Sequence, residues 1–150
     1  MKTPLPKLRI RPKASQYRLR IARSASHRYG VFAVEDIPPR RRVIEYTGKR
    51  IPLEKAWKIR PPKDIYIVAL NSGWCLDASS AGSGAEFINH SCNPNLEWRR
   101  VGNHLLLFSR RKIRAGEELS WKYHYPVKLK RVACHCGARG CRGVLRFILS

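Results

Sequence analysis

Three cysteines lie within eight residues near the end of the chain, in C-H-C-G-A-R-G-C over 134–141. Such close spacing is typical of metal sites, and structural zinc takes four thiolate or imidazole ligands in a tetrahedron. Gly137, Gly140 and Gly143 provide the turns that aim three sulfurs at one point. A fourth ligand must therefore come from elsewhere, and the segment that carries it has to fold against this tail.

Two further cysteines compete for the fourth position. Cys75 lies in an apolar, strand-like run, where a buried free thiol is expected. Cys92 lies in F-I-N-H-S-C-N-P-N over 87–95, a polar segment with neither helical nor strand periodicity. A loop held by internal hydrogen bonds, with its thiol committed to a metal, explains this composition. His135 lies between two tail ligands and should point away. We predict four zinc ligands, Cys92, Cys134, Cys136 and Cys141.

Charge is the dominant bulk feature of the sequence. The 31 Lys and Arg residues against 10 Asp and Glu residues leave a formal net charge of +21. Such a surplus repels itself in a compact fold unless something offsets it. A solvated surface accounts for part of the charge, but a polyanionic partner accounts better for its excess. We therefore expect contact with DNA or RNA.

The cysteine count and the N-terminus bear on the compartment. Five cysteines are an odd number, and no apolar segment follows the basic N-terminus, so we expect neither a disulfide framework nor a secretory signal. No apolar run approaches the roughly 20 residues that a membrane helix needs. We expect an intracellular protein, in the cytoplasm or nucleoid if bacterial, and in the nucleus on chromatin if eukaryotic or delivered to a host.

Most of the 150 residues have the pattern of short strands in a single domain. Runs of β-branched and aromatic residues bounded by turn residues predict strands at 17–23, 29–34, 42–48, 65–70, 74–78, 104–110 and 118–123. Pro52 predicts the first turn of a short helix over 52–59, and another helical turn is expected within 84–89. Residues 1–16, basic and proline-rich, are interpreted as a flexible arm. The predicted class is mostly β, with several small sheets.

The segment F-I-N-H-S-C-N-P-N closely resembles the signature of SET-domain protein-lysine methyltransferases. In members with a post-SET tail, three tail cysteines and the cysteine of N-H-S-C bind one zinc ion, and C-H-C-G-A-R-G-C-R-G resembles that tail. Y-G-V-F-A-V-E-D-I-P-P-R-R-R-V-I-E-Y-T-G and G-E-E-L-S-W-K-Y-H-Y resemble the family's N-terminal and final motifs, in family order. The resemblance implies a SET fold with a knot-like C-terminal crossing. It divides the chain into an arm (1–16), a SET domain (17–128) and a post-SET zinc-binding tail (129–150).

The resemblance also implies a reaction, methyl transfer from S-adenosylmethionine to the uncharged ε-amine of a lysine. The substrate implied is a histone or a histone-like, DNA-bound protein. A lysine ammonium with a pKa near 10.4 must first lose its proton, which desolvation and the nearby sulfonium charge favour. Alignment of the amine and the methyl group at about 3 Å then supplies much of the acceleration, with no strong base or catalytic metal.

Roles for individual residues follow from the same resemblance. Tyr123 is expected to be the catalytic tyrosine, and Tyr66 to lie near the reacting atoms. Both of these residues, and Tyr29, could instead be ordinary core aromatics. The residues expected at the cofactor are His27, Arg28, Tyr29, Tyr66, Asn89, His90 and Tyr123. The residues expected along the lysine channel are Tyr46, Trp121 and Tyr125. Position 121 commonly sets how many methyl groups are added, and a tryptophan there leaves that number open.

Some residues depart from the family pattern, two of them lysines in place of acids: Arg28, Lys49, Glu86 and Lys122. Three of them, Arg28, Lys49 and Lys122, favour an alternative together with the charge, namely a zinc-stapled nucleic-acid-binding module with weak or no catalysis. The presence of Tyr123, Asn89 and His90 at their family positions favours the enzyme. A metal-dependent hydrolase is disfavoured, because the five histidines show no ligand pairing with carboxylates.

Overall fold

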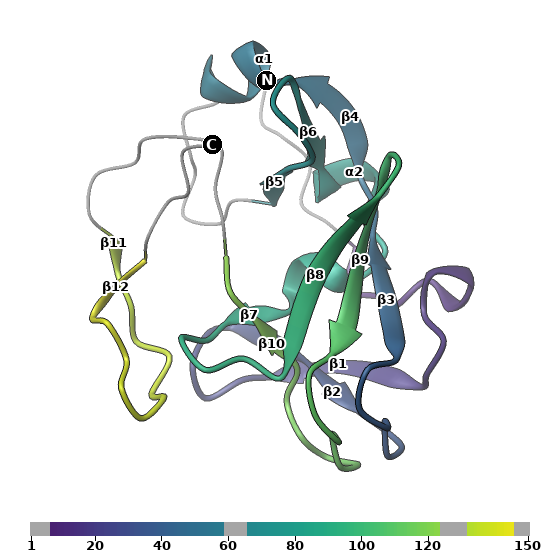
Figure 1. The fold of residues 1–150 in the computed structure, drawn as a ribbon, viewed down its shortest axis with the longest axis vertical. Helices are drawn as coiled ribbons and strands as arrows, with labels where there is room; N and C mark the ends of the chain where they lie inside the picture. Colours follow the sequence, from purple (N-terminus) through teal and green to yellow (C-terminus); the bar gives the residue numbers. More distant parts are fainter. Residues whose placement is uncertain (1–6, 59–65, 124–131, 146–150) are drawn as a thin grey trace.

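The computed structural model describes residues 7–58, 66–123 and 132–145, in which short strands form small sheets (Figure 1). Two antiparallel three-stranded sheets make up the body of the fold. The first has the order β3-β9-β8, with the strands Arg42–Tyr46, His104–Ser109 and Leu96–Val101. The second has the order β4-β6-β5, with the strands Lys49–Pro52, Trp74–Asp77 and Ile67–Ala69.

Shorter pairs and single helical turns complete the described structure. The pairs are antiparallel β1–β2 (Leu19–Arg23 with Tyr29–Ala33), parallel β7–β10 (Asn89–His90 with Ser120–Trp121) and antiparallel β11–β12 (Val132–Ala133 with Val144–Leu145). The helical segments are η1 (Pro12–Ala14), α1 (Leu53–Lys58), α2 (Ala78–Ala81) and η2 (Ala85–Phe87). Within the described ranges, no helix is long and apolar enough to cross a membrane.

Strand periodicity explains which side chains enter the core. Ile44 faces Leu107 across the first sheet, and Tyr46 faces Leu105; all four are buried, because opposed side chains share one face of a sheet. The same cluster includes aliphatic residues from β2, from the turn after β9 and from the positions just before β7 and β10, namely Val31, Ile113, Ile88 and Leu119. Burial of each such side chain contributes about 1.5 to 3 kcal/mol to folding.

The mostly β class is confirmed, and the predicted strands are present with bounds that differ by up to two residues. The predicted run 42–48 ends as β3 at Tyr46, and β4 begins after Gly48. A Cβ on Gly48 would lie 2.7 Å from the backbone of Asp77, so the chain needs glycine at this change of sheet. The helix expected over 52–59 is α1, and the turn expected within 84–89 is η2.

The sequence does not predict β8, because L-E-W-R-R-V is half charged. Leu96 is its only buried residue, yet the strand pairs with β9 along its whole length. An edge strand needs only one partner, so charged side chains are tolerated along it. The dipeptide Gly102-Asn103 joins β8 to β9, and Gly-Asn between two strands is a hairpin signal that would have revealed the strand.

The prediction of a flexible arm over 1–16 is wrong for residues 10–16. Ile10 packs against the core, and Pro12 begins a 3₁₀ turn. The Arg11 N–H donates to the Ser83 carbonyl at 2.8 Å, and Ser15 forms an isolated β-bridge with Ile44. Apolar contacts of Ile10 and Ala14 and several backbone hydrogen bonds thus outweigh the basic, proline-rich composition that suggested an arm.

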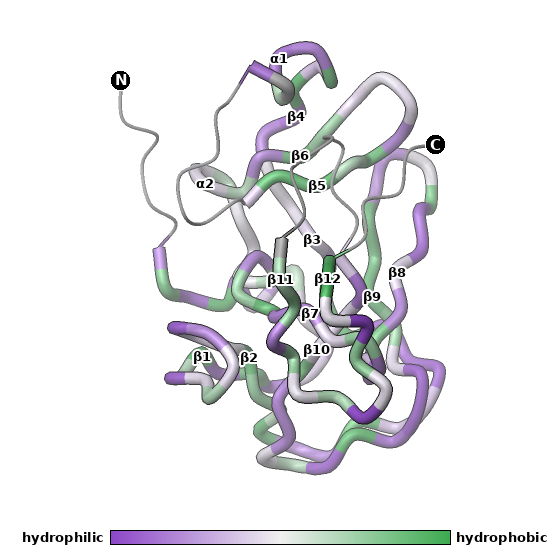
Figure 2. The backbone as a smooth tube through the Cα atoms, turned by 90° about the vertical axis from the view of Figure 1, so that its left-hand side faces the viewer, coloured by the Kyte–Doolittle hydropathy of each residue, from purple (hydrophilic) through white to green (hydrophobic). Residues whose placement is uncertain are grey.

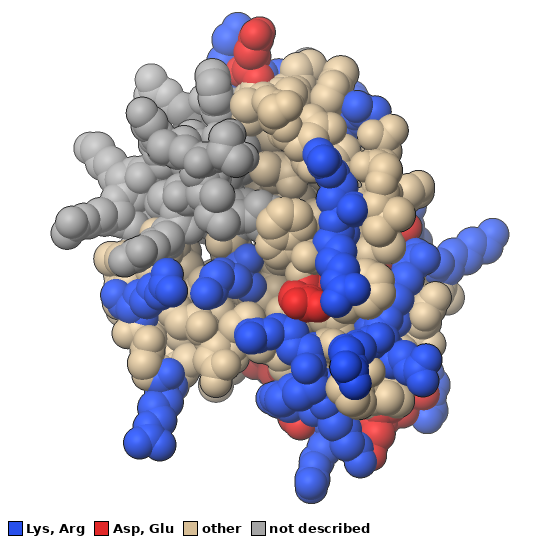
Figure 3. All heavy atoms as spheres, in the orientation of Figure 1, with Lys and Arg blue, Asp and Glu red and all other residues tan. Residues whose placement is uncertain are grey.

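Two views show how the tail and the charge are arranged. From the side, the β11–β12 hairpin lies over the parallel pair β7–β10 (Figure 2). In the first orientation, Lys and Arg atoms cover the lower end of the molecule and form a column over β8 and β9, with few acidic atoms between them (Figure 3). The tail therefore lies beside the F-I-N-H-S-C segment, and Lys and Arg atoms are dense at the lower end of the face shown in Figure 3.

Candidate active site and metal centre

The parallel pair brings the F-I-N-H-S-C segment against the final motif of the sequence. Its register sets Ser120 beside Asn89. Asn95 fastens this crossing, because its side chain accepts from the Ser120 N–H at 2.9 Å and donates to the Glu118 carbonyl at 2.9 Å. The Asn95 side chain is buried, so these hydrogen bonds are shielded from water and hold the two segments in one register.

Tyr123 lies just beyond β10, among aromatic side chains. Its ring centroid is 5.6 Å from that of Trp121 and 5.4 Å from that of His90, both in edge-to-face geometry. Trp121 is buried and lies 5.9 Å from Tyr46. The Tyr123 hydroxyl donates to the Ile88 carbonyl at 2.8 Å, which fixes the orientation of the phenol. The structure thus brings together four residues that the sequence predicted for the site.

Asn89 connects the β1–β2 hairpin to the same crossing. Its amide donates to the Tyr29 carbonyl at 2.8 Å and to the Glu118 carboxylate at 2.9 Å. That carboxylate also accepts from the Ser24 hydroxyl at 2.8 Å. A Cβ on Gly30 would overlap the same carboxylate oxygen, so a larger residue at this position would have to displace the Glu118 side chain from these partners. The carboxylate thus holds three separate segments together.

His90 joins Tyr123 to the cysteine cluster. Its Nδ1 accepts from the Tyr123 backbone N–H at 3.0 Å. Burial and, to a smaller extent, the positive charge of Lys122 lower the pKa of His90 to about 4, so the ring is neutral near pH 7. With Nδ1 accepting, the ring proton resides on Nε2, which lies 3.5 Å from the Cys92 sulfur and can donate to it.

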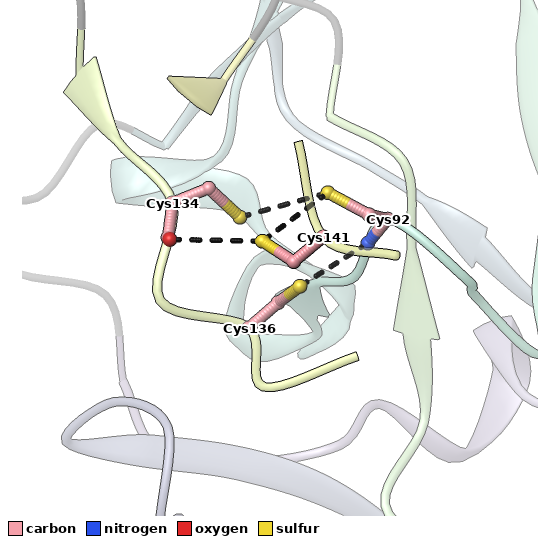
Figure 4. Close-up of side chains that lie close together, drawn as sticks. All are labelled: Cys92, Cys134, Cys136 and Cys141. Atoms are coloured by element: carbon pink, nitrogen blue, oxygen red, sulfur yellow. Dashed lines mark hydrogen bonds between the residues drawn. The ribbon is translucent and has the colours of Figure 1, made fainter. Parts of the chain in front are cut away.

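The four predicted metal ligands converge. Their sulfur atoms all lie within 4.8 Å of one another, and the side chains point toward a common centre (Figure 4). The Cys92 sulfur is 3.7 Å from that of Cys134 and 3.9 Å from that of Cys141. A tetrahedron with Zn–S bonds of about 2.3 Å has sulfur–sulfur edges of roughly 3.8 Å. The donor set and its size therefore fit structural zinc.

Backbone N–H groups around the cluster donate hydrogen bonds to sulfur atoms, which stabilises the negatively charged thiolate form. The Cys92 N–H donates to the Cys136 sulfur, and the Gly143 N–H to the Cys141 sulfur, each at 3.5 Å. Burial opposes ionisation of Cys136, but hydrogen bonds from the N–H groups of Cys92 and Ala138 and from the side chains of Cys141 and Cys134 together outweigh it and lower the pKa of that thiol to about 6. Gly143 has a φ of 75°, which glycine adopts readily. His135 is exposed and outside the cluster, as expected.

The remaining predicted residues lie around this centre or beyond the described structure. Tyr66 accepts at its backbone carbonyl from the Tyr46 hydroxyl at 3.1 Å, and its ring packs on Phe87. His27 and Arg28 are exposed in the turn before β2. Tyr125 lies outside the described residues. Cys75 is fully buried and free, as predicted.

Sequence reasoning missed three residues that organise the site, Ser24, Asn95 and Glu118. Asn95 and Glu118 lie inside motifs that the sequence analysis quoted, so their position in the sequence could have identified them. They were missed because their side chains only hold other residues in place, whereas arguments from motif spacing select residues that react or bind. Ser24 carries no signal in the sequence, because its partner Glu118 is 94 residues away.

Glu86, one of the departures from the family pattern, is a buried carboxyl group. It accepts from the Gly84 N–H at 2.8 Å. Burial raises the pKa of Glu86 to about 7, although the N–H donors and the positive charge of Arg11 oppose the rise. The acid is thus accommodated in the turn that precedes β7. Lys49 and Lys122 are exposed.

A known family matches most of this chain. The SET domain family model matches residues 28–124, which include the crossing, the aromatic cluster and Cys92. The chain therefore belongs to the SET-domain family. Its four-cysteine cluster is consistent with the zinc site of a post-SET tail.

Among curated relatives, the histone-lysine N-methyltransferases set-2 of Caenorhabditis elegans and SETD1 of Drosophila melanogaster are each 34% identical to this chain. The matches cover 85% and 89% of this chain but 9% of each relative. This chain therefore spans about a tenth of the length of these relatives.

Among solved structures, two of KRYPTONITE are similar, each with 32% identity and covering 88% of this chain and 30% of that one. The complex with mCHH DNA, an H3(1-15) peptide and SAH has a TM-score of 0.73, and the complex with mCHG DNA and SAH has a TM-score of 0.74.

Proposed function

We propose that this chain is an S-adenosylmethionine-dependent protein-lysine N-methyltransferase that acts on a histone or a histone-like protein bound to DNA. One observation carries the proposal most directly. Tyr123, the first tyrosine of the segment that resembles the family's final motif, is held among aromatic rings by a hydrogen bond from its hydroxyl to the Ile88 carbonyl. The relatives named histone-lysine N-methyltransferases and the neighbour structures with SAH support the same reaction.

Tyr123 has a defined role in this proposal. Its hydroxyl proton is directed at the Ile88 carbonyl, so its oxygen can act only as an acceptor toward a second group. An acceptor at this point orients a lysine amine and the methyl group that it attacks. Bound S-adenosylmethionine supplies the electrophilic methyl group on a sulfonium.

The surroundings of Tyr123 favour the binding of a sulfonium cation and the deprotonation of a lysine ammonium group. Trp121, His90 and Tyr46 present aromatic rings, which attract cations such as a sulfonium. Exclusion of water disfavours the ammonium form of a lysine and lowers its pKa. The uncharged amine is the nucleophile, so these residues favour the reaction without a catalytic carboxylate.

Zinc has a structural role in the proposal. The four cysteines would hold it, with Cys92 on the loop that follows β7 and the other three in the tail. Because His90 lies between Cys92 and Tyr123, the metal centre would also fix the position of the tyrosine. The tail is thereby fastened over the parallel pair.

The positive charge supports action on chromatin or another nucleoprotein. A protein with +21 and ten acids is poorly equipped to attract a free basic histone tail. DNA next to the substrate would offset this repulsion, and one similar solved structure contains both DNA and an H3 peptide. We infer that the working location is on DNA, and on chromatin where the substrate is eukaryotic.

The test is methyl transfer from labelled S-adenosylmethionine to a histone H3 tail peptide and to reconstituted nucleosomes, with mass spectrometry for the site and the number of methyl groups. Turnover by the parent chain and loss of about 100-fold or more in Tyr123→Phe are expected. The matched control Tyr17→Phe, a half-buried tyrosine that packs against the core elsewhere, should retain turnover.

Calorimetry with S-adenosylmethionine separates the enzyme from a noncatalytic zinc-stapled module. Binding by both the parent and Tyr123→Phe, with turnover only in the parent, supports the proposal. Absence of binding together with tight DNA binding would favour the module instead.

A further inference from the structure

We propose that two adjacent turns, residues 38–42 and 110–114, form a docking surface for the phosphodiester backbone of double-stranded DNA. We call this surface the basic double turn. The inference deepens the proposed action on a DNA-bound protein and rests on it for its biological role. Its experiment measures DNA binding directly, so it can fail or succeed independently of catalysis.

One buried serine fastens the first turn to the end of β9. Ser109 accepts at its carbonyl from the Arg40 N–H at 2.8 Å and at its hydroxyl oxygen from the Arg41 N–H at 2.9 Å. The same hydroxyl donates to the Pro38 carbonyl at 2.6 Å. Because Ser109 is fully buried, these hydrogen bonds are shielded from water. The first turn is therefore rigid, and it lies directly beside the start of the second turn.

A β-bridge fastens the second turn to the first. The backbones of Ile37 and Ile113 exchange hydrogen bonds at 2.7 and 2.9 Å, and both side chains are fully buried. After the bridge, the Ala115 N–H donates to the Asp36 carboxylate at 2.9 Å. Both turns therefore present their exposed side chains from one fixed backbone.

The basic double turn carries more positive charge than its neighbours neutralise. Its cations are Arg40, Arg41, Arg42, Arg110, Arg111, Lys112 and Arg114. Three of them form ion pairs, with Glu45, Glu117 and Asp36. Arg110 donates to the Pro94 carbonyl. Within the described part of the chain, the exposed Arg40, Arg41 and Arg114 form no ion pair, and only Arg114 has its charge partly offset, by the nearby carboxylates of Asp36 and Glu117.

Arg40 has an unusual backbone for an arginine. Its φ is 58°, the left-handed conformation that glycine or asparagine adopts at lower cost. The hydrogen bond to Ser109 stabilises this conformation. Glycine or asparagine would fit this backbone with less strain. The arginine instead places a second exposed positive charge next to Arg41. The observation points to a requirement for the side chain rather than for the turn.

The chemistry of the basic double turn fits phosphate. The guanidinium group presents donors that match phosphate oxygens two at a time. Neither turn contains an aromatic residue for base stacking, so sequence-independent backbone contact is expected. The basic column over β8 and β9 extends from this end of the molecule, an elongated arrangement that suits a linear polyanion (Figure 3). Membrane binding would need an exposed apolar face, and the turns expose no large apolar side chain.

The position of the surface relates it to the site. Four residues after Arg114, the chain reaches Glu118, which holds Asn89. The second turn is thus connected to the proposed active site through a short, hydrogen-bonded segment. DNA on the basic double turn would hold a DNA-bound substrate at a fixed position relative to Tyr123. The three unpaired arginines make no side-chain hydrogen bond to a described site residue, so removing them should leave chemistry on a free peptide unchanged.

The experiment compares two triple variants of the full chain that lose the same charge. The test variant is Arg40→Asn, Arg41→Gln, Arg114→Gln, in which asparagine tolerates the left-handed backbone. The control is Lys13→Gln, Lys55→Gln, Lys58→Gln, three exposed lysines outside the two turns. The probe is a mixed-sequence 20-base-pair duplex, measured by fluorescence anisotropy over a range of salt concentrations. Circular dichroism checks that both variants fold.

We expect the test variant to lose affinity by about tenfold or more and its salt slope to fall by about 2 to 3, because fewer counterions are released. The control should change much less. Equal losses in both variants would overturn the proposal, since net charge alone would then explain binding. Equal binding to phosphatidylserine vesicles, lost in the same variant, would also overturn it in favour of a lipid surface. H3 peptide turnover reports separately on the proposed enzyme.

Discussion

His90 accepts a hydrogen bond at Nδ1 from the backbone N–H of Tyr123, with 3.0 Å between the two nitrogens. On its other side, Nε2 of the same ring lies 3.5 Å from the sulfur of Cys92. One neutral imidazole thus links a metal ligand to the proposed catalytic tyrosine. We interpret His90 as a positioning residue whose two nitrogens act on different partners.

Replacement of His90 by phenylalanine keeps an aromatic ring at this position but removes the hydrogen bonds to the Tyr123 N–H and the Cys92 sulfur. Loss of such a contact to a metal ligand typically costs 10- to 100-fold in metal affinity or activity. We expect weaker zinc binding in competition with a chromophoric chelator and lower peptide turnover in the zinc-saturated protein. His135→Phe is the matched control, because His135 is exposed between two ligands. Equal behaviour of the two variants would contradict the role of His90.

Gly30→Ala should disturb the site by displacing the carboxylate of Glu118. The added methyl group would lie 2.2 Å from the Glu118 oxygen and displace it from Asn89 and Ser24. Loss of these hydrogen bonds should cost about 1 to 3 kcal/mol in the free energy of unfolding, measured by urea denaturation. Gly73→Ala, where the nearest atom is 4.0 Å away, should change it by less than about 0.5 kcal/mol.

The metal centre makes a prediction about stoichiometry. The parent chain should purify with one zinc per chain, and Cys92→Ser should bind zinc much more weakly, because the ligand that joins the tail to the loop is lost. Cys75→Ala should retain the metal, since Cys75 is buried away from the cluster. Elemental analysis measures both. Chelation of the parent should lower its Tm, and full retention of zinc by Cys92→Ser would refute the ligand assignment.

Glu86 should make stability depend on pH. In the folded chain it keeps its proton up to about pH 7, whereas an exposed glutamate loses it near 4.5. Between these values the folded state binds more protons, so the free energy of unfolding falls as pH rises. Glu86→Gln stays neutral and can still accept from Gly84. Relative to the parent, the variant should gain about 1 to 3 kcal/mol between pH 5 and pH 8.

Urea denaturation at saturating zinc measures this difference and separates it from protonation of the cysteines. Glu54→Gln, at an exposed position in α1, is the matched control and should show no such gain. A constant difference between Glu86→Gln and the parent at both pH values would mean that Glu86 does not hold its proton in the folded protein.

Much of the fold follows from local patterns in the sequence. Strands such as β2 and β9 are recognisable because apolar, β-branched and aromatic residues are bounded by turn residues, a signal contained in a few neighbours. The pairing of Cys92 with the tail was also inferable, since zinc chemistry demands a fourth ligand and only two cysteines remained. These inferences succeed because the constraint is local or because the donor set is small.

The tertiary structure decided what depends on distant partners. β8 exists because β9 pairs with it, and residues 10–16 are ordered because Ile10 and Arg11 find the core and Ser83. The carboxylate of Glu118 meets Ser24 only after the chain has folded. Composition revealed a large positive charge, but only the folded backbone places the cations of 38–42 beside those of 110–114, through the hydrogen bonds of Ser109 and the bridge between Ile37 and Ile113. Residue type and spacing are written in the chain, whereas hydrogen bonds between segments far apart in sequence depend on the folded backbone.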